Sequence, residues 1–204
     1  PSYTRIPEIH FMHEARYRGA KLVVIAPDYN ATAVHADYWI NPQIGTDAAL
    51  ALAMAQVIVE ENLYKEDYVR EQTDLAILVR DDTKRYLRAA DLSATGGKDV
   101  LQFWDEAGDR LAVVPGCEGE GSTSLHLGSL RPSLTGRREV TLADGKTVGV
   151  RPLLDVLRAH LDGGYRPEQA AKVTGVTPAT IRRIARELAK ANSAMIFSSW
   201  GACK

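Results

Sequence analysis

Helix-like and strand-like spacings of apolar residues follow one another at the start of the chain. Residues 7–18 (PEIHFMHEARYR) predict a helix, because Pro7 suits the first helical position and Gly19 lies just beyond the end. Residues 21–26 (KLVVIA) follow as a short, continuous apolar run. Such a run is typical of a strand in a parallel sheet that is covered on both faces. A helix and a buried strand in close succession favour a βαβ-type architecture.

A second, longer helix is predicted over residues 47–62, and either Thr46 or Asp47 can cap its start. Many of its apolar residues recur at the spacing of one helix face, namely Leu50, Ala53, Met54, Val57 and Ile58. Leu52 and Val59 fall on another face. We therefore expect this helix to be largely buried.

The middle of the chain has a looser pattern. Residues 65–72 predict a short amphipathic helix and residues 76–80 a strand, and irregular structure is expected after residue 81. Residues 138–150 (REVTLADGKTVGV) alternate between apolar and polar on each side of Asp144-Gly145. This pair suits a type I′ turn, so the segment predicts a β-hairpin.

Three helices and a last strand are predicted for the remainder, at residues 152–162, 167–174, 178–191 and 194–198. The predicted fold class is α/β: a parallel-sheet domain of the dinucleotide-binding type, with a β-hairpin excursion and a C-terminal helical hairpin, incomplete as it stands. The corresponding segments are an α/β cofactor-binding segment at 1–80, an irregular and hairpin insertion at 81–150, and a helical segment at 151–204 that returns to a core strand.

Composition excludes several classes of protein. The 204 residues carry a net charge of −1, which gives no electrostatic reason to expect a nucleic-acid partner. No apolar run is long enough to cross a bilayer, and no signal peptide opens the chain. Cys117 and Cys203 are too few for a disulfide framework or a metal cluster, so two unpaired thiols are the simpler interpretation. Because the chain starts at Pro1 and stops just after an apparent buried strand, we expect an internal piece of a larger subunit.

Two loops that follow predicted strands could carry chemistry. The first is Ala26-Pro27-Asp28-Tyr29-Asn30, where an acidic side chain at the end of a parallel strand can accept hydrogen bonds from a ribose or a base. The second is Gly45-Thr46-Asp47, where glycine permits close approach of a ligand and the helix start offers unpaired N–H groups. The alternatives are an ordinary strand-ending turn and an ordinary helix cap, and the local pattern does not decide between them.

Weaker candidates lie elsewhere. Arg5, at a helix entrance, could contact a pyrophosphate or form a surface ion pair. His10 and His13 share a helix face, but no third metal ligand follows at a convincing spacing. Residues 169–188 resemble a helix-turn-helix unit that would read DNA through three arginines, Arg182, Arg183 and Arg186. A tight helical hairpin used only for packing has the same glycine and small-residue requirements.

Several stretches, in one order, resemble the respiratory nitrate reductase branch of the dimethyl-sulfoxide-reductase superfamily. They are TRIPEIHF at 4–11, ARYRG at 15–19, VIAPDY at 24–29, GTDAALA at 45–51, YVR at 68–70, TD at 73–74, LRAADL at 87–92, TGV at 174–176, IRRIARE at 181–187 and WG at 200–201. The similarity covers both ends of the chain and is weakest at 94–150. Together these stretches form a specific signal, which no single motif provides.

The resemblance implies a large catalytic subunit that holds molybdenum between two molybdopterin guanine dinucleotides. It implies that Pro27, Asp28 and Tyr29, together with Gly45, Thr46 and Asp47, lie on loops around a guanosine end. Thr4 and Arg5 would follow another cofactor loop, and Trp200 and Gly201 would begin a loop near the second pterin. The metal-ligating aspartate and the cysteines of an iron–sulfur cluster would lie upstream, outside this chain.

The resemblance also implies an activity and partners. The expected reaction is a two-electron oxo transfer or hydroxylation coupled to iron–sulfur electron transfer. The expected partners are the remainder of the same subunit and an iron–sulfur beta subunit, with a haem b subunit as a further candidate. Neither a nucleic-acid partner nor a direct membrane span is expected. The export side of the membrane, periplasmic or membrane-associated, is the expected location.

Overall fold

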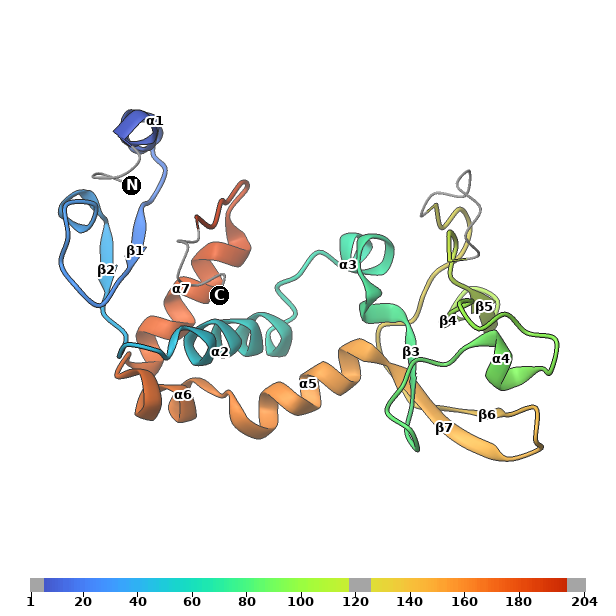
Figure 1. Ribbon diagram of the computed structural model, residues 1–204. Helices are drawn as coiled ribbons and strands as arrows, with labels where there is room; N and C mark the ends of the chain where they lie inside the picture. The colour runs from blue at the N-terminus through green and yellow to red at the C-terminus, as the bar shows by residue number, and fades with distance from the viewer. Residues whose placement is uncertain (1–5, 118–125, 198–204) are drawn as a thin grey trace. The chain divides into compact units, whose positions relative to one another are not determined.

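A computed structural model describes residues 6–117 and 126–197 of the chain (Figure 1). The chain forms two compact units, with boundaries at Glu61/Asn62 and His160/Leu161. The first unit combines the N-terminal and C-terminal portions, and the second is formed by the middle of the chain. This division differs from the three segments drawn from the sequence, because β3 (Leu78–Arg80) pairs with β7 (Thr147–Pro152) inside the middle unit.

The first unit begins with a helix and a small parallel sheet (Figure 1). Helix α1 (Ile6–Tyr17) leads into strand β1 (Val23–Ile25), and a short 3-10 helix, η1 (Ala33–His35), precedes strand β2 (Tyr38–Ile40). The two strands are parallel, with Val23 opposite Tyr38 and Ile25 opposite Ile40. The predicted helix and parallel strand are therefore confirmed, whereas β2 was not predicted.

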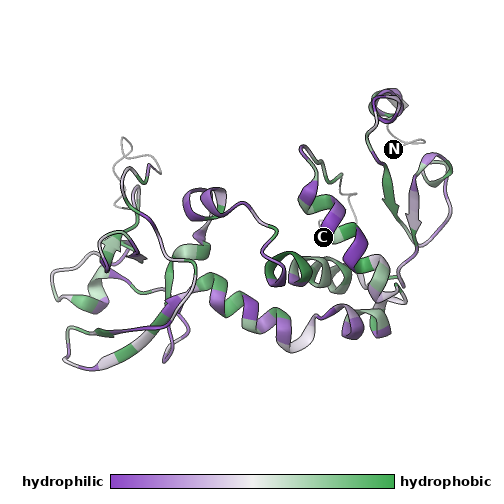
Figure 2. Ribbon diagram, turned by 180° about the vertical axis from the view of Figure 1, so that it is seen from behind, coloured by the Kyte–Doolittle hydropathy of each residue, from purple (hydrophilic) through white to green (hydrophobic). Residues whose placement is uncertain are grey.

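Helix α2 (Asp47–Glu60) packs against α6 (Pro167–Thr174) and α7 (Pro178–Lys190) to form the core of the first unit. The buried residues of this core are Ile40, Leu50, Ala53, Ala170, Val176, Ile181 and Ile184. Helix α2 is apolar on most of its surface and α7 has separate polar and apolar faces, as the colours of Figure 2 show. These contacts confirm that α2 is a buried helix, because apolar residues on several faces need neighbours on several sides.

The turn between α6 and α7 has a packing role. Gly175 adopts a left-handed conformation with φ +74° and ends α6.

The three arginines of the proposed recognition helix have partners within the unit. Arg182 pairs with Glu168 at 2.7 Å, Arg186 pairs with Glu61 at 2.7 Å, and Arg183 lies 3.9 Å from the centre of the Tyr38 ring. The helix-turn-helix interpretation therefore loses its basis, since these cations already have partners.

The predicted buried strand at residues 194–198 is wrong over 194–197, and Ser198 lies outside the described residues. Residues 194–197 form no strand and are exposed, with Met195 81% and Ile196 76% accessible. A run of apolar residues becomes a strand only when a neighbouring strand accepts its hydrogen bonds. Among the described residues, the sheet of the first unit contains only β1 and β2.

The second unit is built on antiparallel strands (Figure 1). Its elements are α3 (Glu66–Gln72), η2 (Asp74–Ala76), β3, α4 (Ala89–Leu92), β4 (Gln102–Asp105), β5 (Arg110–Val113), β6 (Arg138–Thr141), β7 and the start of α5 (Leu153–Gly164). Strand order is β3-β7-β6 in one sheet and β4-β5 in another. The predicted strand at 76–80 forms only over Leu78–Arg80, because Ala76 ends η2, and it pairs with β7 in an antiparallel sheet and not in a parallel one. The β4–β5 hairpin and α4 were not predicted, because their short segments lack a sustained period.

The hairpin at 138–150 is confirmed, but its turn type was predicted wrongly. The Gly145 amide donates to the Leu142 carbonyl at 2.9 Å, and the Leu142 amide donates to the Lys146 carbonyl at 2.9 Å. Gly145 has φ +82°, whereas Asp144 does not have a positive φ. A type I′ turn requires positive φ at both central residues. The loop is therefore a three-residue connection that ends in a left-handed glycine.

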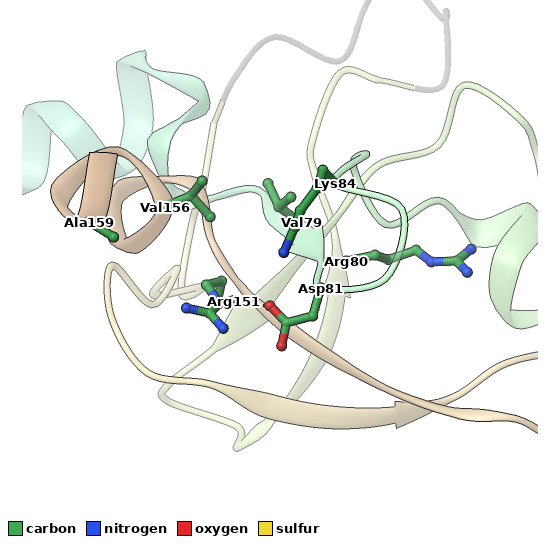
Figure 3. A pocket seen from close by; sticks show the side chains of 7 residues that line it. All are labelled: Val79, Arg80, Asp81, Lys84, Arg151, Val156 and Ala159. Carbon is green, nitrogen blue, oxygen red and sulfur yellow. Dashed lines mark hydrogen bonds and ion pairs between the residues drawn. The ribbon is translucent and has the colours of Figure 1, made fainter. Parts of the chain in front are cut away.

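An ion cluster stabilises the sheet of the second unit. Asp81 accepts hydrogen bonds from Arg137 Nε at 2.7 Å and from Arg151 Nε at 2.8 Å. Figure 3 shows Asp81 and Arg151 beside a cavity of about 190 Å³. Gly149 makes room for the cluster, because a Cβ atom at this position would collide with Arg137 and Asp81. The hydrogen bond from Arg151 contributes most to holding the pKa of Asp81 below its usual range, and the hydrogen bond from Arg137 contributes less. Burial alone would raise this pKa.

Neutralising Asp81 should loosen the β6–β7 hairpin at neutral pH. Two partly exposed ion pairs contribute about 1 kcal/mol together, so Asp81→Asn should speed hydrogen exchange in residues 138–152 by about fivefold at pH 7. A carboxyl group with a lowered folded-state pKa stabilises the fold above its unfolded pKa of about 3.9 and loses this effect as the pH falls through the folded value. The difference between the two proteins should therefore shrink as the pH falls below about 3.9 and disappear once Asp81 is protonated in the folded protein. Asp99→Asn, at a side chain that is 94% exposed, is the matched control and should change little.

The backbone before α2 needs a glycine. Gly45 has φ +81°, and no atom lies within 4 Å of the position that a Cβ would occupy. Gly45→Ala should therefore lower the free energy of unfolding by about 1–2 kcal/mol through backbone strain alone. Gly163→Ala is the control, because Gly163 lies in the last turn of α5 with equally open surroundings and without a positive φ. This change should be neutral or stabilising by up to about 1 kcal/mol. Denaturant midpoints of the full catalytic subunit would measure both, and equal effects would contradict the strain argument.

Candidate cofactor-binding site

The parallel sheet places the two predicted loops at one edge. β1 ends at Ile25 and β2 ends at the register partner Ile40, so residues 26–30 and 41–47 leave the sheet on the same side. The Ala26 amide also donates to the Ile40 carbonyl at 3.0 Å, which continues the pairing by one residue. We call this side the carboxyl edge. The carboxyl ends of adjacent parallel strands are the usual position of ligand sites in open α/β sheets.

The first loop is held by its own backbone and by Trp39. The indole Nε1 of Trp39 donates to the Ala26 carbonyl at 3.0 Å. The Asn30 side chain accepts hydrogen bonds from the amides of Thr32 and Ala33 and so closes the loop into η1. The Tyr29 ring meets the Trp39 ring edge-on at 5.1 Å and remains 59% exposed. Backbone and aromatic contacts thus fix the loop from which Pro27, Asp28 and Tyr29 project.

The second loop leaves the start of α2 without a side-chain cap. The Thr46 hydroxyl donates to the Gln43 carbonyl at 2.6 Å, and the Thr46 side chain accepts no amide of the helix. The expectation that Thr46 caps α2 through its side chain is therefore wrong, because its hydroxyl is used in the preceding turn. The first-turn amides are left for another acceptor. Asp47 lies in this first turn, where the helix dipole favours a negative charge.

The two acidic side chains of the carboxyl edge are unengaged. The carboxylates of Asp28 and Asp47 are exposed and have no hydrogen-bond or ion-pair partner among residues 6–117 and 126–197. Most other acidic groups near the sheet have partners, such as Asp37, which accepts from Arg16 and from the Leu22 amide. Exposed carboxylates, free helix amides and an open glycine together suit the donor and acceptor groups of a nucleoside.

Four other predicted site residues cannot be placed. Thr4, Arg5, Trp200 and Gly201 lie outside the described residues. Sequence reasoning also missed Trp39, which anchors the first loop. Its position becomes informative only when residues 38–40 are recognised as a strand, because the indole then lies beside the loop that follows the neighbouring strand.

The described part of the chain has neither a candidate membrane span nor a candidate metal site. It contains no helix that is long and apolar enough to cross a membrane. The same part of the chain contains no group of three or more His, Cys, Asp and Glu side chains placed to hold a metal ion. No metal ligand is therefore assigned to these residues.

Comparison with known proteins identifies relatives along the whole chain. It is 42% identical to the alpha subunit of perchlorate reductase from Dechloromonas aromatica (strain RCB), over 98% of this chain and 24% of that protein. It is 38% identical to the alpha subunit of dimethylsulfide dehydrogenase from Rhodovulum sulfidophilum, over 98% of this chain and 21% of that protein. Among solved structures, acetylene hydratase from Pelobacter acetylenicus is similar over 93% of this chain and 15% of the hydratase chain, with a TM-score of 0.49 and 18% sequence identity. The chain thus spans about a quarter or less of the length of its curated relatives.

The family comparison agrees with these relatives. The family model described as "Molybdopterin oxidoreductase" matches residues 3–204, which is nearly the entire chain. The stretches that suggested this superfamily from the sequence, from residue 4 to residue 201, fall within that match. The chain belongs to the molybdopterin oxidoreductase family.

Proposed function

We propose that this chain is part of a molybdenum-dependent catalytic subunit and binds the guanosine end of a molybdopterin guanine dinucleotide. The reaction of the whole subunit would be a two-electron oxo transfer or hydroxylation. Support comes from the family and from relatives that are named as alpha subunits of reductases and of a dehydrogenase. The observation that carries the proposal is the common carboxyl edge of β1 and β2, from which both candidate loops project.

Each residue at this edge has a chemical role in the proposal. The Asp47 carboxylate accepts hydrogen bonds from N1 and N2 of the guanine, and the Asp28 carboxylate accepts from a ribose hydroxyl. Gly45 lets the backbone approach the ligand, since no side chain occupies the surrounding space. Tyr29 offers an exposed ring that Trp39 keeps in one orientation. Pro27 and Thr46 shape the two loops, and Thr46 does so through its bond to Gln43.

The bound cofactor supplies the two-electron redox chemistry, whereas the residues of this chain bind and orient it. In the proposal the subunit holds two such dinucleotides around one molybdenum. Thr4 and Arg5 would contribute near one cofactor, and Trp200 and Gly201 near the second pterin. The iron–sulfur ligands and the metal-ligating residue would belong to the rest of the subunit. The proposed partners of this chain are the rest of the subunit, an iron–sulfur beta subunit and a haem b subunit. The periplasmic or membrane-associated location remains a prediction.

Removing the Asp47 carboxylate should weaken retention of the cofactor. Loss of a charge-assisted hydrogen bond to the guanine costs about 1.5–3 kcal/mol, which corresponds to roughly 10- to 150-fold weaker binding. In the full subunit, Asp47→Ala should therefore lower the molybdenum content and the guanine nucleotide released by acid after dialysis. Metal analysis and pterin fluorescence would measure both quantities.

Asp67→Ala is the matched control for this experiment. Asp67 is an exposed acid in the first turn of α3, so this variant loses the same charge at the same kind of helix position. It should retain its cofactor. Full molybdenum occupancy in Asp47→Ala, or an equal loss in both variants, would contradict the proposed role of Asp47.

A further inference from the structure

A second cluster of polar side chains lies at the opposite edge of the β1–β2 sheet. The side chains of His13, Arg16, Tyr17 and His35 line a cavity of about 230 Å³. The first three belong to the last turns of α1, which precede β1, and His35 ends η1, which precedes β2. The Leu22 amide donates to Asp37 at 2.7 Å and so links the segment before β1 to the segment before β2. This amino edge is therefore separated from residues 26–30 and 41–47 by the length of the strands.

The cavity is lined by groups that donate hydrogen bonds or carry positive charge. Arg16 is held in place by Asp37, which accepts from its Nε at 3.3 Å and from its Nη2 at 3.2 Å. The Nη1 group of Arg16 has no partner among the described residues. The phenol of Tyr17 adds another donor, and Tyr17 itself is 89% exposed. Four neighbouring side chains, each able to donate, form a surface complementary to an oxyanion.

The two imidazoles supply the second observation. Nε2 of His13 is buried and has no hydrogen-bond partner in the part of the chain that the structure describes. The rings of His13 and His35 are 4.4 Å apart between centroids and tilted by 58°. An unpaired buried polar atom costs free energy unless a ligand or a water satisfies it. Both imidazoles can become donors at both nitrogens when they take up protons.

We propose that the cavity between α1 and η1 binds a small tetrahedral oxyanion of the sulfate or phosphate class. His13 and His35 would contact it as N–H donors, with Arg16 and Tyr17 completing the site. A metal ion fits the cavity less well, because the guanidinium of Arg16 would repel it and no third ligand side chain is present among the described residues. The site is independent of the proposed cofactor site, since it lies at the other edge of the sheet.

The charged groups around the cavity are paired with one another. On α1, Arg16 lies beside the imidazole of His13, and Glu14 pairs with Arg18 at 2.6 Å. Asp37 follows η1, and its pKa is lowered first by the bond from the Leu22 amide and then by Arg16. The Lys21 ammonium forms an ion pair with the Glu187 carboxylate at 3.1 Å. The carboxylates near the cavity are therefore already paired with cations, and they do not compete with an anion for His13 and His35.

Titration calorimetry of the cofactor-loaded subunit with sodium sulfate tests this site. We expect saturable binding of sulfate at pH 6, and we expect His13→Gln and His35→Gln each to weaken it by about tenfold or more. His10→Gln is the control, because His10 lies one turn away on α1 with its ring against Phe11. This variant should bind sulfate as the unaltered subunit does.

Several results would overturn the proposal. These are no saturable sulfate binding at pH 6, unchanged binding in both His13→Gln and His35→Gln, or an equal loss in His10→Gln. Tight zinc binding in the absence of sulfate binding would instead make the two histidines metal ligands. Unchanged molybdenum content in His35→Gln, a change at an exposed residue, would show that the variant is folded. Failure of the sulfate site leaves the cofactor test with Asp47 unaffected, since the two measurements have separate readouts.

Discussion

The parallel pairing of β1 with β2 determines where the chemistry of the first unit can lie. Parallel strands end on the same side, so one register, with Ile25 opposite Ile40, brings the loops at 26–30 and 41–47 to a common edge. Two strands of three residues are too few to be stable alone. Their support comes from the core, where Ile40 packs with α2, α6 and α7, and from Asp37, which ties Arg16 and the Leu22 amide together. Packing of the helices therefore fixes the geometry of the loops.

The distribution of charge partners separates structural ion pairs from the groups proposed to bind ligands. In the second unit, Asp81 is satisfied by two arginines, and in the helical hairpin Arg182 and Arg186 each have a carboxylate partner. These pairs hold elements together and leave no charge for a ligand. At the carboxyl edge, by contrast, the carboxylates of Asp28 and Asp47 have no partner among the described residues. At the amino edge, donors outnumber acceptors around His13. The same sheet thus offers unpaired carboxylates beside helix amides at one edge and mainly donors at the other.

Elements with a sustained apolar period were predictable from the sequence, and elements that depend on a neighbour were not. The period of 3.6 residues was enough for α2 and for the three C-terminal helices. Strand β2 has only Tyr38, Trp39 and Ile40, too few residues to reveal alternation. The run at 194–197 has the composition of a strand but lacks a neighbouring strand among the described residues. The direction in which β3 pairs likewise depends on β7, which follows it by more than sixty residues.

Local pattern could not decide between a helix cap and a ligand loop at residues 45–47, because both need the same residue types. The order of several stretches along the chain pointed to the family, and the family comparison bears that out. The structure adds a physical reason to prefer a ligand role at this junction. Had the Thr46 hydroxyl capped α2, the first-turn amides would already have an acceptor. Because it donates to Gln43 instead, these amides lack a side-chain cap beside the exposed Asp47 carboxylate, and the mixed set of donors and acceptors suits the proposed purine nucleotide.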